Sequence, residues 1–267
     1  MIINPYAFGV SYDPDAQAFF TASGLTGATN LTAINNLVVA LKGFGIWTKM
    51  KAIYPFVGGT AALHKWNLKD PQDTNAAFRL VFSGGWTHSS TGALPNGTNA
   101  YANTFLSTSL IGLNSGHLAY YSRSNTTISG GEMGYLKSGP DSYTDLGARF
   151  GTFGAYIRYN VSTAGTFVAN TDSRGFYTGT RTGLTTTKLF KNGSSIQTLN
   201  TISNSTATVP IFIGAENNVG GGTLNNPDYY SNRECAFSSI GDGLTDTEAA
   251  NFYTAVQAYQ TTLSRQI

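Results

Sequence analysis

The stretch Lys188-Leu-Phe-Lys-Asn-Gly-Ser-Ser-Ile196 decides the fold class of this chain. At its centre, Asn192 and Gly193 are the two residue types that most readily adopt the positive φ angles of a type I′ turn, so the sequence predicts a β-hairpin with a two-residue loop. In that register Leu189 pairs with Ile196, and both apolar side chains lie on one face. The hairpin therefore indicates an antiparallel sheet with one buried face.

Further strand patterns follow residue 50 on both sides of this hairpin. They have a period of two and are bounded by turn residues, and they cover Lys51–Val57, Ala77–Phe82, Leu118–Arg123, Phe153–Asn160, Arg174–Arg181, Thr186–Lys191, Ser195–Leu199, Val209–Ala215 and Arg233–Ile240. In the fourth of these, alternation predicts two faces: Phe153, Ala155, Ile157 and Tyr159 on one, and Tyr156 and Arg158 on the other.

Helical signals precede the strands. Asp13 is placed to cap a short helix over Ala16–Ala22. A second apolar stripe with helical spacing runs from about Asn30 to Lys42, and Gly43 follows as its terminator. Both helices are expected to pack against one edge of the sheets.

The chain closes with a third helical signal. Thr245 and Glu248 have the spacing of a capping box, in which each side chain bonds the other residue's backbone N–H. Apolar residues then recur at helical spacing, namely Ala249, Phe252, Val256, Tyr259 and Leu263. We expect the Phe252 and Val256 face of this helix to dock on the sheet.

These elements define the fold class. Many short strands without βαβ alternation predict an all-β jelly-roll sandwich with short N-terminal helices and a C-terminal capping helix. Residues 1–50 would form a helical segment packed on the sandwich, and residues 51–267 the sandwich with its helix, as a single globular unit.

Composition narrows the function classes. Charged residues make up 11% of the chain and the net charge is +2, so no strong field favours nucleic acid or a membrane surface. The single cysteine, Cys235, rules out an internal disulfide and is expected to be buried. Met1–Pro5 lacks the features of a signal peptide, and no apolar run is long enough to span a membrane. A soluble protein made in a cytoplasm is expected.

Three features of the C-terminal third resemble the laminin-G-like branch of the concanavalin A-like jelly rolls. They are the hairpin Lys188–Gly193, the strand Val209–Gly214 and the closing run Ala236–Glu248. The resemblance implies the same sandwich that the strand pattern predicts.

The chain also resembles uncharacterised jelly-roll proteins of tailed bacteriophages. The features behind this are the stretches Lys49–Gly59 and Ala77–His88 and the low charge. The resemblance implies a non-enzymatic structural component of a virion, such as a capsid decoration, a fibre or a tail-associated module. Its partners would be other virion proteins, in a homo-oligomer or multicopy assembly. This is the leading hypothesis from the sequence.

The alternative is a lectin-like module that attaches to bacterial surface glycans. Sugar sites combine aromatic faces with side chains that bond hydroxyls. Two loops carry such residues, and the candidates are Trp86, His88, Asn99, Tyr101, Asp228 and Tyr229. The competing interpretation is that these aromatic residues cover the core or form a subunit contact.

A second alternative is an endo-acting glycosidase, which needs two carboxyl groups on either side of the bond that is cleaved. Glu216 and Glu234 could meet across neighbouring strands, but no cluster of alternating acids occurs. We therefore assign no catalytic residue and expect no enzymatic activity.

A metal site is not indicated by the histidines, because His64, His88 and His117 lack zinc-binding spacing. The laminin-G-like resemblance leaves calcium as a possible cofactor, with Asp172, Asn217 and Asp228 as candidate ligands. Otherwise no cofactor is expected.

Overall fold

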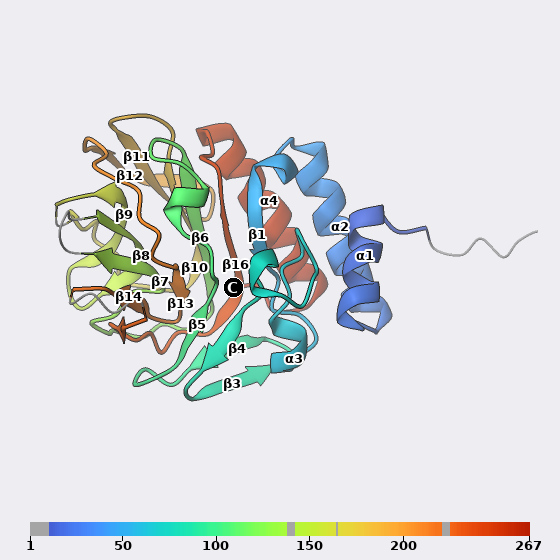
Figure 1. Cartoon of the computed structure of the whole chain (residues 1–267). Coiled ribbons are helices and arrows are strands. Elements are labelled where there is room, and N and C mark those ends of the chain that lie inside the picture. Colours follow the sequence, from blue (N-terminus) through green and yellow to red (C-terminus); the bar gives the residue numbers. More distant parts are fainter. Residues whose placement is uncertain (1–10, 138–141, 164, 221–224) are drawn as a thin grey trace, which may run out of the picture.

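The computed structural model describes residues 11–137, 142–163, 165–220 and 225–267. Met1–Pro5, on which the expectation about a signal peptide rests, lies outside these residues. Within the described residues the chain is mostly sheet, and two curled sheets form a sandwich with short helices on one side (Figure 1).

Sheet A has the strand order β12-β11-β10-β6-β16-β4-β3, and β1 also pairs with β16. Its strands are β1 (Met50–Tyr54), β3 (Trp86–Ser89), β4 (Gly92–Pro95), β6 (Gly116–Ser122), β10 (Gly175–Arg181), β11 (Thr186–Lys191), β12 (Ser194–Asn200) and β16 (Cys235–Gly241).

Sheet B has the order β15-β14-β7-β13-β5-β2, with β8 pairing β7 and β9. Its strands are β2 (Val81–Ser83), β5 (Tyr101–Asn103), β7 (Met133–Lys137), β8 (Ser142–Phe150), β9 (Gly154–Val161), β13 (Phe212–Ile213), β14 (Glu216–Asn218) and β15 (Pro227–Asp228).

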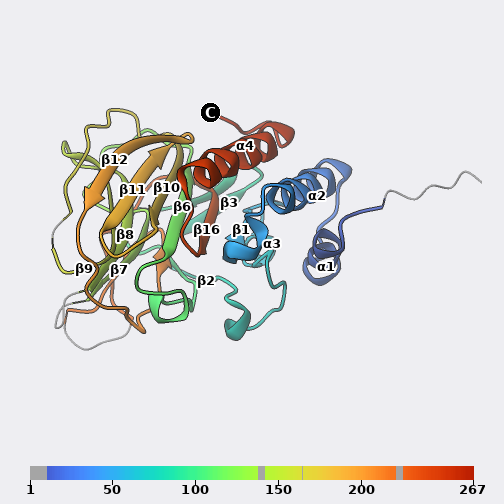
Figure 2. The same ribbon diagram turned by 90° about the horizontal axis from the view of Figure 1, so that it is seen from above.

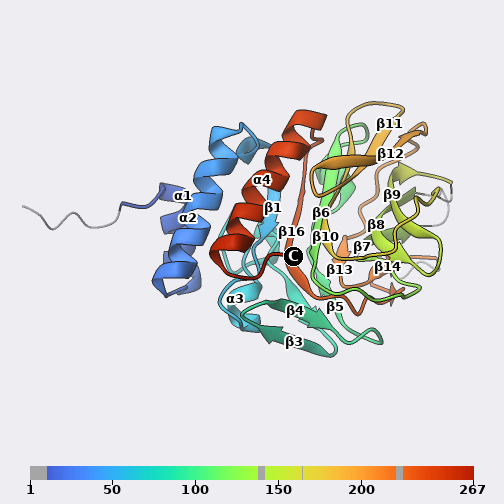
Figure 3. The same ribbon diagram turned by 180° about the vertical axis from the view of Figure 1, so that it is seen from behind.

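Helices α1, α2 and α4 form a layer on sheet A, on the side away from sheet B (Figure 2). The α-helices are α1 (Pro14–Ser23), α2 (Ala28–Gly43), α3 (Ala61–His64) and α4 (Asp246–Thr262), and the 3₁₀ helices are η1 (Trp47–Lys49), η2 (Asn75–Ala77) and η3 (Thr108–Leu110). Seen from behind, α4 lies directly on sheet A and α2 beyond it (Figure 3).

Two cores follow from this layering. One joins the helices to sheet A and contains Phe176, Phe237 and Phe252. The other lies between the sheets and contains Leu118 and Ile157. Since sheet A is covered on both faces, its central strands β6, β10 and β16 are buried along their whole length. On the face of sheet B that points away from sheet A, the described residues form no second layer of helices or strands.

The deciding hairpin is confirmed, with one correction. Asn192 and Gly193 have φ angles of 51° and 75°, as the predicted turn requires. The register between β11 and β12 shifts by one residue between Phe190 and Leu189, so that Leu189 pairs with Gln197 and not with Ile196. This β-bulge adds one residue to β12, which bends the strand at the sheet edge.

The helix predictions are confirmed with small shifts. Asp13 caps α1, and Thr245 and Glu248 form the predicted capping box of α4. Gly43 is the last residue of α2 and not the residue after it, since the chain leaves the helix at Phe44. Phe252 and Val256 pack on sheet A as expected.

Two strand predictions are wrong over most of their length. Ala77–Phe82 contains the end of η2 and a left-handed residue, Phe78, before β2 begins. Two backbone carbonyls of this segment accept hydrogen bonds from side chains and not from a neighbouring strand. Asn67 donates to Ala77 O, and Tyr54 donates to Phe78 O. Of Val209–Ala215, only β13 pairs as a strand.

The predicted faces of β9 are confirmed except at Phe153. Ala155, Ile157 and Tyr159 are fully buried. Phe153 is 63% exposed, because it lies in the turn before β9, where its N–H bonds Phe150 O. Cys235 is buried and unpaired, as expected. No helix in the described part of the chain has the length and apolar character needed to cross a bilayer.

Candidate functional site

The residues of the first predicted sugar-binding loop lie close together, and several of their polar atoms form hydrogen bonds with the surrounding backbone. Trp86 Nε1 donates to Ser83 O and to Tyr101 O. Asn99 Oδ1 accepts from Gly85 N–H. These bonds fix Trp86 and Asn99 in the β3–β4 and β5 region, and the sugar-binding role of Trp86, Asn99 and Tyr101 stays a prediction.

His88 has a partner that the sequence did not suggest. Its Nδ1 lies 2.9 Å from Nδ1 of His64. Gly59 N–H donates to His64 Nε2, so the proton of His64 sits on Nδ1 and is donated to His88. Burial lowers the pKa of His64 to about 3, and also lowers the pKa of His88. The pair is therefore neutral near pH 7 and holds the β3–β4 hairpin to α3.

The calcium candidates fall in two places. Asp172 lies in the loop before β10, where the hydrogen bond from Arg174 lowers its pKa to about 2. Asn217 and Asp228 belong to the paired strands β14 and β15. Asn217 Oδ1 accepts from Asn226 N–H, and both Asp228 oxygens accept from the protein.

Oxygens of all three side chains accept hydrogen bonds from the protein. Calcium needs several oxygens around one point, whereas these residues lie in two places. Among the described residues, no group of three or more His, Cys, Asp or Glu side chains could hold a metal ion. Calcium binding stays an untested prediction.

The two glutamates of the glycosidase hypothesis lie on different sheets. Glu234 directly precedes β16 and is paired with Arg123 at 2.8 Å. Glu216 begins β14 of sheet B and is 1% exposed. The structure therefore gives no support to a Glu216 and Glu234 catalytic pair, but it places Glu216 in a different constellation.

That constellation is a pocket of about 180 Å³ on sheet B, which we call the aromatic pocket. It is lined by Leu136, Phe150, Tyr156, Arg158, Gly165, Phe167, Glu216 and Tyr229. Strand alternation explains its position, because Ile157 faces the core between the sheets while its neighbours Tyr156 and Arg158 face outward. Of the predicted sugar-binding residues, Tyr229 lines this pocket.

The floor of the aromatic pocket is a buried polar cluster. Arg158 Nε donates to Asp145 Oδ1 at 2.6 Å, and Nη2 bonds the second oxygen. The Asp145 side chain is fully buried and that of Arg158 is 16% exposed. Tyr156 OH donates to Glu216 Oε1 at 2.7 Å. The register of β8 and β9 brings Asp145 opposite Arg158 and so builds this ion pair.

Three glycines make room for this floor. A Cβ at Gly147 would lie 2.0 Å from the Tyr156 ring, and one at Gly131 would lie 2.1 Å from Glu216 Oε1. A Cβ at Gly134 would lie 2.4 Å from Asp145 Cβ. The close packing of polar side chains on this face therefore depends on the absence of side chains beneath them.

The floor holds two carboxyl groups and one guanidinium. Burial, followed by the charge of Asp145, raises the pKa of Glu216 well above its ordinary value. Burial acts to lower the pKa of Arg158, but the Asp145 carboxylate outweighs it and raises that pKa. Arg158 and Asp145 thus form an ion pair, and the surroundings of Glu216 favour its protonated form.

The rim of the pocket is aromatic and partly exposed. Phe167 is 40% exposed and Tyr229 is 37% exposed. Phe150 contacts both rings, with centroid distances of 5.8 Å and 6.4 Å. Exposed rings above hydrogen-bonding groups are the arrangement with which proteins bind sugars, whose faces are apolar and whose edges carry hydroxyls.

Sequence reasoning missed most of this pocket. The outward faces of Tyr156 and Arg158 were predicted, but without a role. Asp145 lies on β8, which showed no strand signal of its own, and Phe167 lies in an irregular segment. The available signal was a strand whose outward positions carry an aromatic and a charged residue, Tyr156 and Arg158.

Replacing Glu216 with glutamine tests the protonation of the floor. The amide can donate towards Asp145 and still accept from Tyr156, as the protonated carboxyl does. A raised pKa means that Glu216 contributes stability below its ordinary value of 4.5, and that this contribution is lost as the pH rises. In urea unfolding from about pH 4.5 to about pH 8, the variant should lose less stability than the wild type.

At the upper end of that pH range, Glu216→Gln should be at least as stable as the wild type. Glu216→Ala is the contrast, because it leaves the Tyr156 hydroxyl without its acceptor and should cost about 1–3 kcal/mol. Equal destabilisation by both variants at about pH 8 would show that Glu216 is ionised in the folded chain.

No protein-family model and no curated protein sequence matches this chain. The search of solved structures, by contrast, finds matching folds.

One is botulinum neurotoxin type C, whose cell entry depends on interaction with two ganglioside molecules; the TM-score is 0.50, with 10% identity over 80% of this chain and 52% of that chain. Another is the sialidase of Trypanosoma rangeli in complex with a difluoro-KDN sugar. The TM-score is 0.50 and the identity is 11%, over 84% of this chain and 39% of the sialidase chain. A third is domain 4 of a GH43 extracellular arabinanase from Geobacillus stearothermophilus in complex with arabinotriose. The TM-score is 0.45 and the identity is 13%, over 76% of this chain and 98% of that domain.

The matches to the neurotoxin and the sialidase confirm the predicted fold, a β-sandwich of the jelly-roll type with short helices. This chain spans about half or less of the neurotoxin and sialidase chains, 52% and 39%. The narrower resemblances to the laminin-G-like branch and to bacteriophage proteins stay predictions.

Proposed function

We propose that this chain is a lectin-like carbohydrate-binding module that binds its glycan in the aromatic pocket and performs no catalysis. The observation that carries the proposal is the combination of two exposed rings, Phe167 and Tyr229, with a buried and charge-balanced polar floor around Arg158. This arrangement offers stacking surfaces at the rim and hydrogen-bonding groups below them.

The fold supports the same proposal. A jelly-roll sandwich is shared with the neurotoxin that interacts with gangliosides and with the sialidase crystallised with a sugar. Those ligands belong to those proteins. They make a glycan a reasonable ligand class for a chain of this fold whose pocket has aromatic walls.

The way in which the two carboxyl groups are held supports binding without catalysis. A glycosidase needs an acid and a carboxylate that both reach the glycosidic bond. Here Asp145 is fully buried with both oxygens on Arg158, and Glu216 is 1% exposed and bonded by Tyr156. Neither group is placed to attack or protonate a sugar that rests on the rim.

The expected place in a virion stays a prediction, as do the multicopy assembly and the virion partners. The neighbours in fold include a neurotoxin and a sialidase, and their likeness to this chain concerns the fold alone. Of the functions considered from the sequence, the lectin-like alternative is the one that the aromatic pocket supports.

Glycan binding can be tested with an array of neutral and acidic oligosaccharides, followed by calorimetry with the best ligand. Tyr229→Ala and Phe167→Ala should each weaken binding about tenfold, which corresponds to about 1.4 kcal/mol of lost ring contact. Phe44→Ala is the matched control, because Phe44 is 38% exposed at the end of α2. Absence of any glycan ligand, or equal losses for all three variants, would contradict the proposal.

A further inference from the structure

A second pocket adjoins the aromatic pocket. It has a volume of about 190 Å³ and shares Arg158 and Gly165 with it. We call it the threonine pocket, because its lining includes Thr163, Thr166, Thr187 and Thr201. It lies where β9 of sheet B meets β11 and β12 of sheet A, since all three strands contribute lining residues.

One buried oxygen in the lining of the threonine pocket has no hydrogen-bond partner in the described part of the chain, and neither has a second on a residue bonded to that lining. Among the described residues, the buried side-chain polar atoms without a partner are Thr187 Oγ1, Gln197 Oε1 and Ser205 Oγ. Thr187 lines the threonine pocket, and the amide of Gln197 is fixed by Thr166, which also lines it. Buried polar atoms usually have partners, so an unpartnered hydroxyl in the lining, and an unpartnered amide oxygen on a residue bonded to the lining, point to a ligand that supplies hydroxyl groups.

Arg158 lines both pockets, and not all of its guanidinium nitrogens are used in hydrogen bonds with the described residues. Its Nε and Nη2 are used by Asp145. Within the described residues, no hydrogen bond from Nη1 is formed. A guanidinium that is fixed by two bonds and has a third nitrogen unused is well placed to bond a hydroxyl where two sugar units join.

The sizes of the pockets favour one ligand across both. Sites for small-molecule ligands usually have volumes of about 300–1,000 Å³. The aromatic pocket has about 180 Å³ and the threonine pocket about 190 Å³, so each alone is small and the two together reach that range.

Charge narrows the class of sugar. The positive charge of Arg158 is matched by Asp145, and Glu216 is the other side chain in the two linings that could carry a full charge near neutral pH. No unpaired cation among these residues would receive a carboxylated sugar. Hydroxyl groups, by contrast, can bond the threonines and Arg158.

We propose that the aromatic pocket and the threonine pocket are adjoining subsites for consecutive units of one neutral oligosaccharide, with Arg158 at the junction. The proposal rests on the carbohydrate-binding function proposed above and adds the length and the charge class of the ligand.

The test is calorimetric titration of the full chain with malto-, cello-, xylo- and arabino-oligosaccharides of one to four units, and with a sialylated trisaccharide. For the series that binds, the affinity should rise at least about tenfold from one unit to two. The sialylated trisaccharide should bind no more tightly than the neutral sugars.

Thr187→Val separates the subsites. The change keeps the side-chain shape and removes the unpartnered hydroxyl, so the variant should melt at or above the wild-type temperature. It should remove most of the gain from the second unit and leave the one-unit affinity unchanged. Thr198→Val is the matched control, because Thr198 is an exposed threonine on the same hairpin. Tyr229→Ala should weaken binding of every length.

Each result has a distinct meaning. Equal affinities for one and two units, or an unchanged gain in Thr187→Val, would overturn the paired subsites while carbohydrate binding stands. Sialylated sugar bound at least tenfold more tightly than neutral sugar would overturn the charge class. Absence of binding to every sugar would overturn the proposed function itself, and the paired subsites with it.

Discussion

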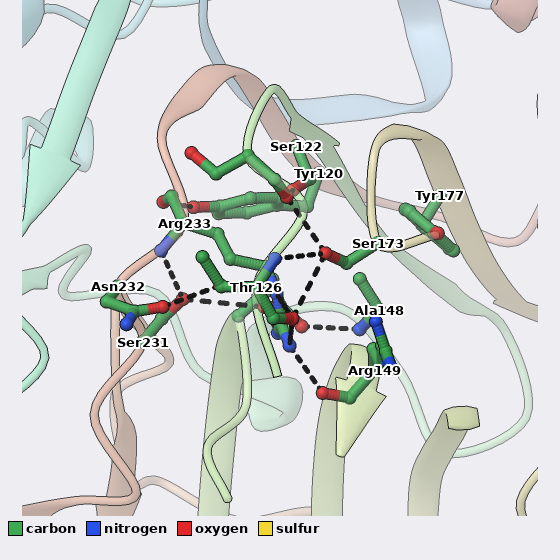
Figure 4. A network of polar contacts seen from close by, with 12 residues as sticks. Tyr120, Ser122, Thr126, Ala148, Arg149, Ser173, Tyr177, Ser231, Asn232 and Arg233 are labelled. Atoms are coloured by element: carbon green, nitrogen blue, oxygen red, sulfur yellow. Dashed lines mark hydrogen bonds and ion pairs between the residues drawn. The ribbon is translucent and has the colours of Figure 1, made fainter. Parts of the chain in front are cut away.

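Replacing Arg233 with methionine is expected to lower the free energy of unfolding by about 3–5 kcal/mol, the usual cost of breaking a buried ion pair from one side. Arg233 and Glu132 form an ion pair in which both side chains are fully buried. Figure 4 shows Arg233 surrounded by the backbone and side chains of Thr126, Arg149 and Ser231.

The cost is large because the partners of Arg233 come from several elements. Its Nη2 donates to Thr126 O at 2.8 Å and to Arg149 O. Glu132 also accepts from Ala148 N–H of β8, while Arg233 lies just before β16 of sheet A. The pair therefore ties the two sheets together, and the variant would leave a buried carboxylate without its counterion.

Urea unfolding of the variant measures this loss. Arg174→Met is the control, because the Arg174 and Asp172 side chains are 50% and 40% exposed and such a pair contributes about 1 kcal/mol or less. The double variant Arg233→Met with Glu132→Leu should recover much of the loss, since neither charge is then buried alone. A single variant as stable as the control would show that the pair contributes little.

Replacing Arg265 with alanine is expected to cost at least about 3 kcal/mol, because several buried carbonyls lose their donor at once. The Arg265 side chain is 1% exposed. It follows α4 and reaches back into the fold, where its nitrogens donate to oxygens of Gln260, Phe56, Ser90, Pro55 and Ala236. These bonds attach the C-terminal segment to the loop after β1 and to β16.

Two truncations give a sharp version of this experiment. A chain that ends at Arg265 keeps the guanidinium and loses Ile267, which is 41% exposed and donates one hydrogen bond to Tyr121. A chain that ends at Ser264 loses the guanidinium as well. In thermal and urea unfolding, the free energy of unfolding of the chain that ends at Arg265 should lie within about 1 kcal/mol of the wild-type value. That of the chain that ends at Ser264 should be well below it. Equal stability of the two would refute the role of Arg265.

Local chemistry made the confirmed elements predictable. The Asn192-Gly193 turn, the Asp13 cap and the Thr245 capping box each depend on a few neighbouring residues, and all three are present. The failures were long-range in origin. The backbone around Ala77 departs from a strand because Asn67 and Tyr54, from elsewhere in the fold, satisfy its carbonyls.

The candidate site divides in the same way. Sequence by itself determined that Tyr156 and Arg158 share the outward face of one strand, because alternation in a strand is set by backbone geometry alone. Only the tertiary structure decided what meets them there. Tyr156 bonds Glu216 across 60 residues of sequence, and Arg158 meets Asp145 through the register of two strands. Pairing between distant segments depends on how the sheets pack and on which glycines leave space. Neither can be predicted from the local residue pattern of a single segment.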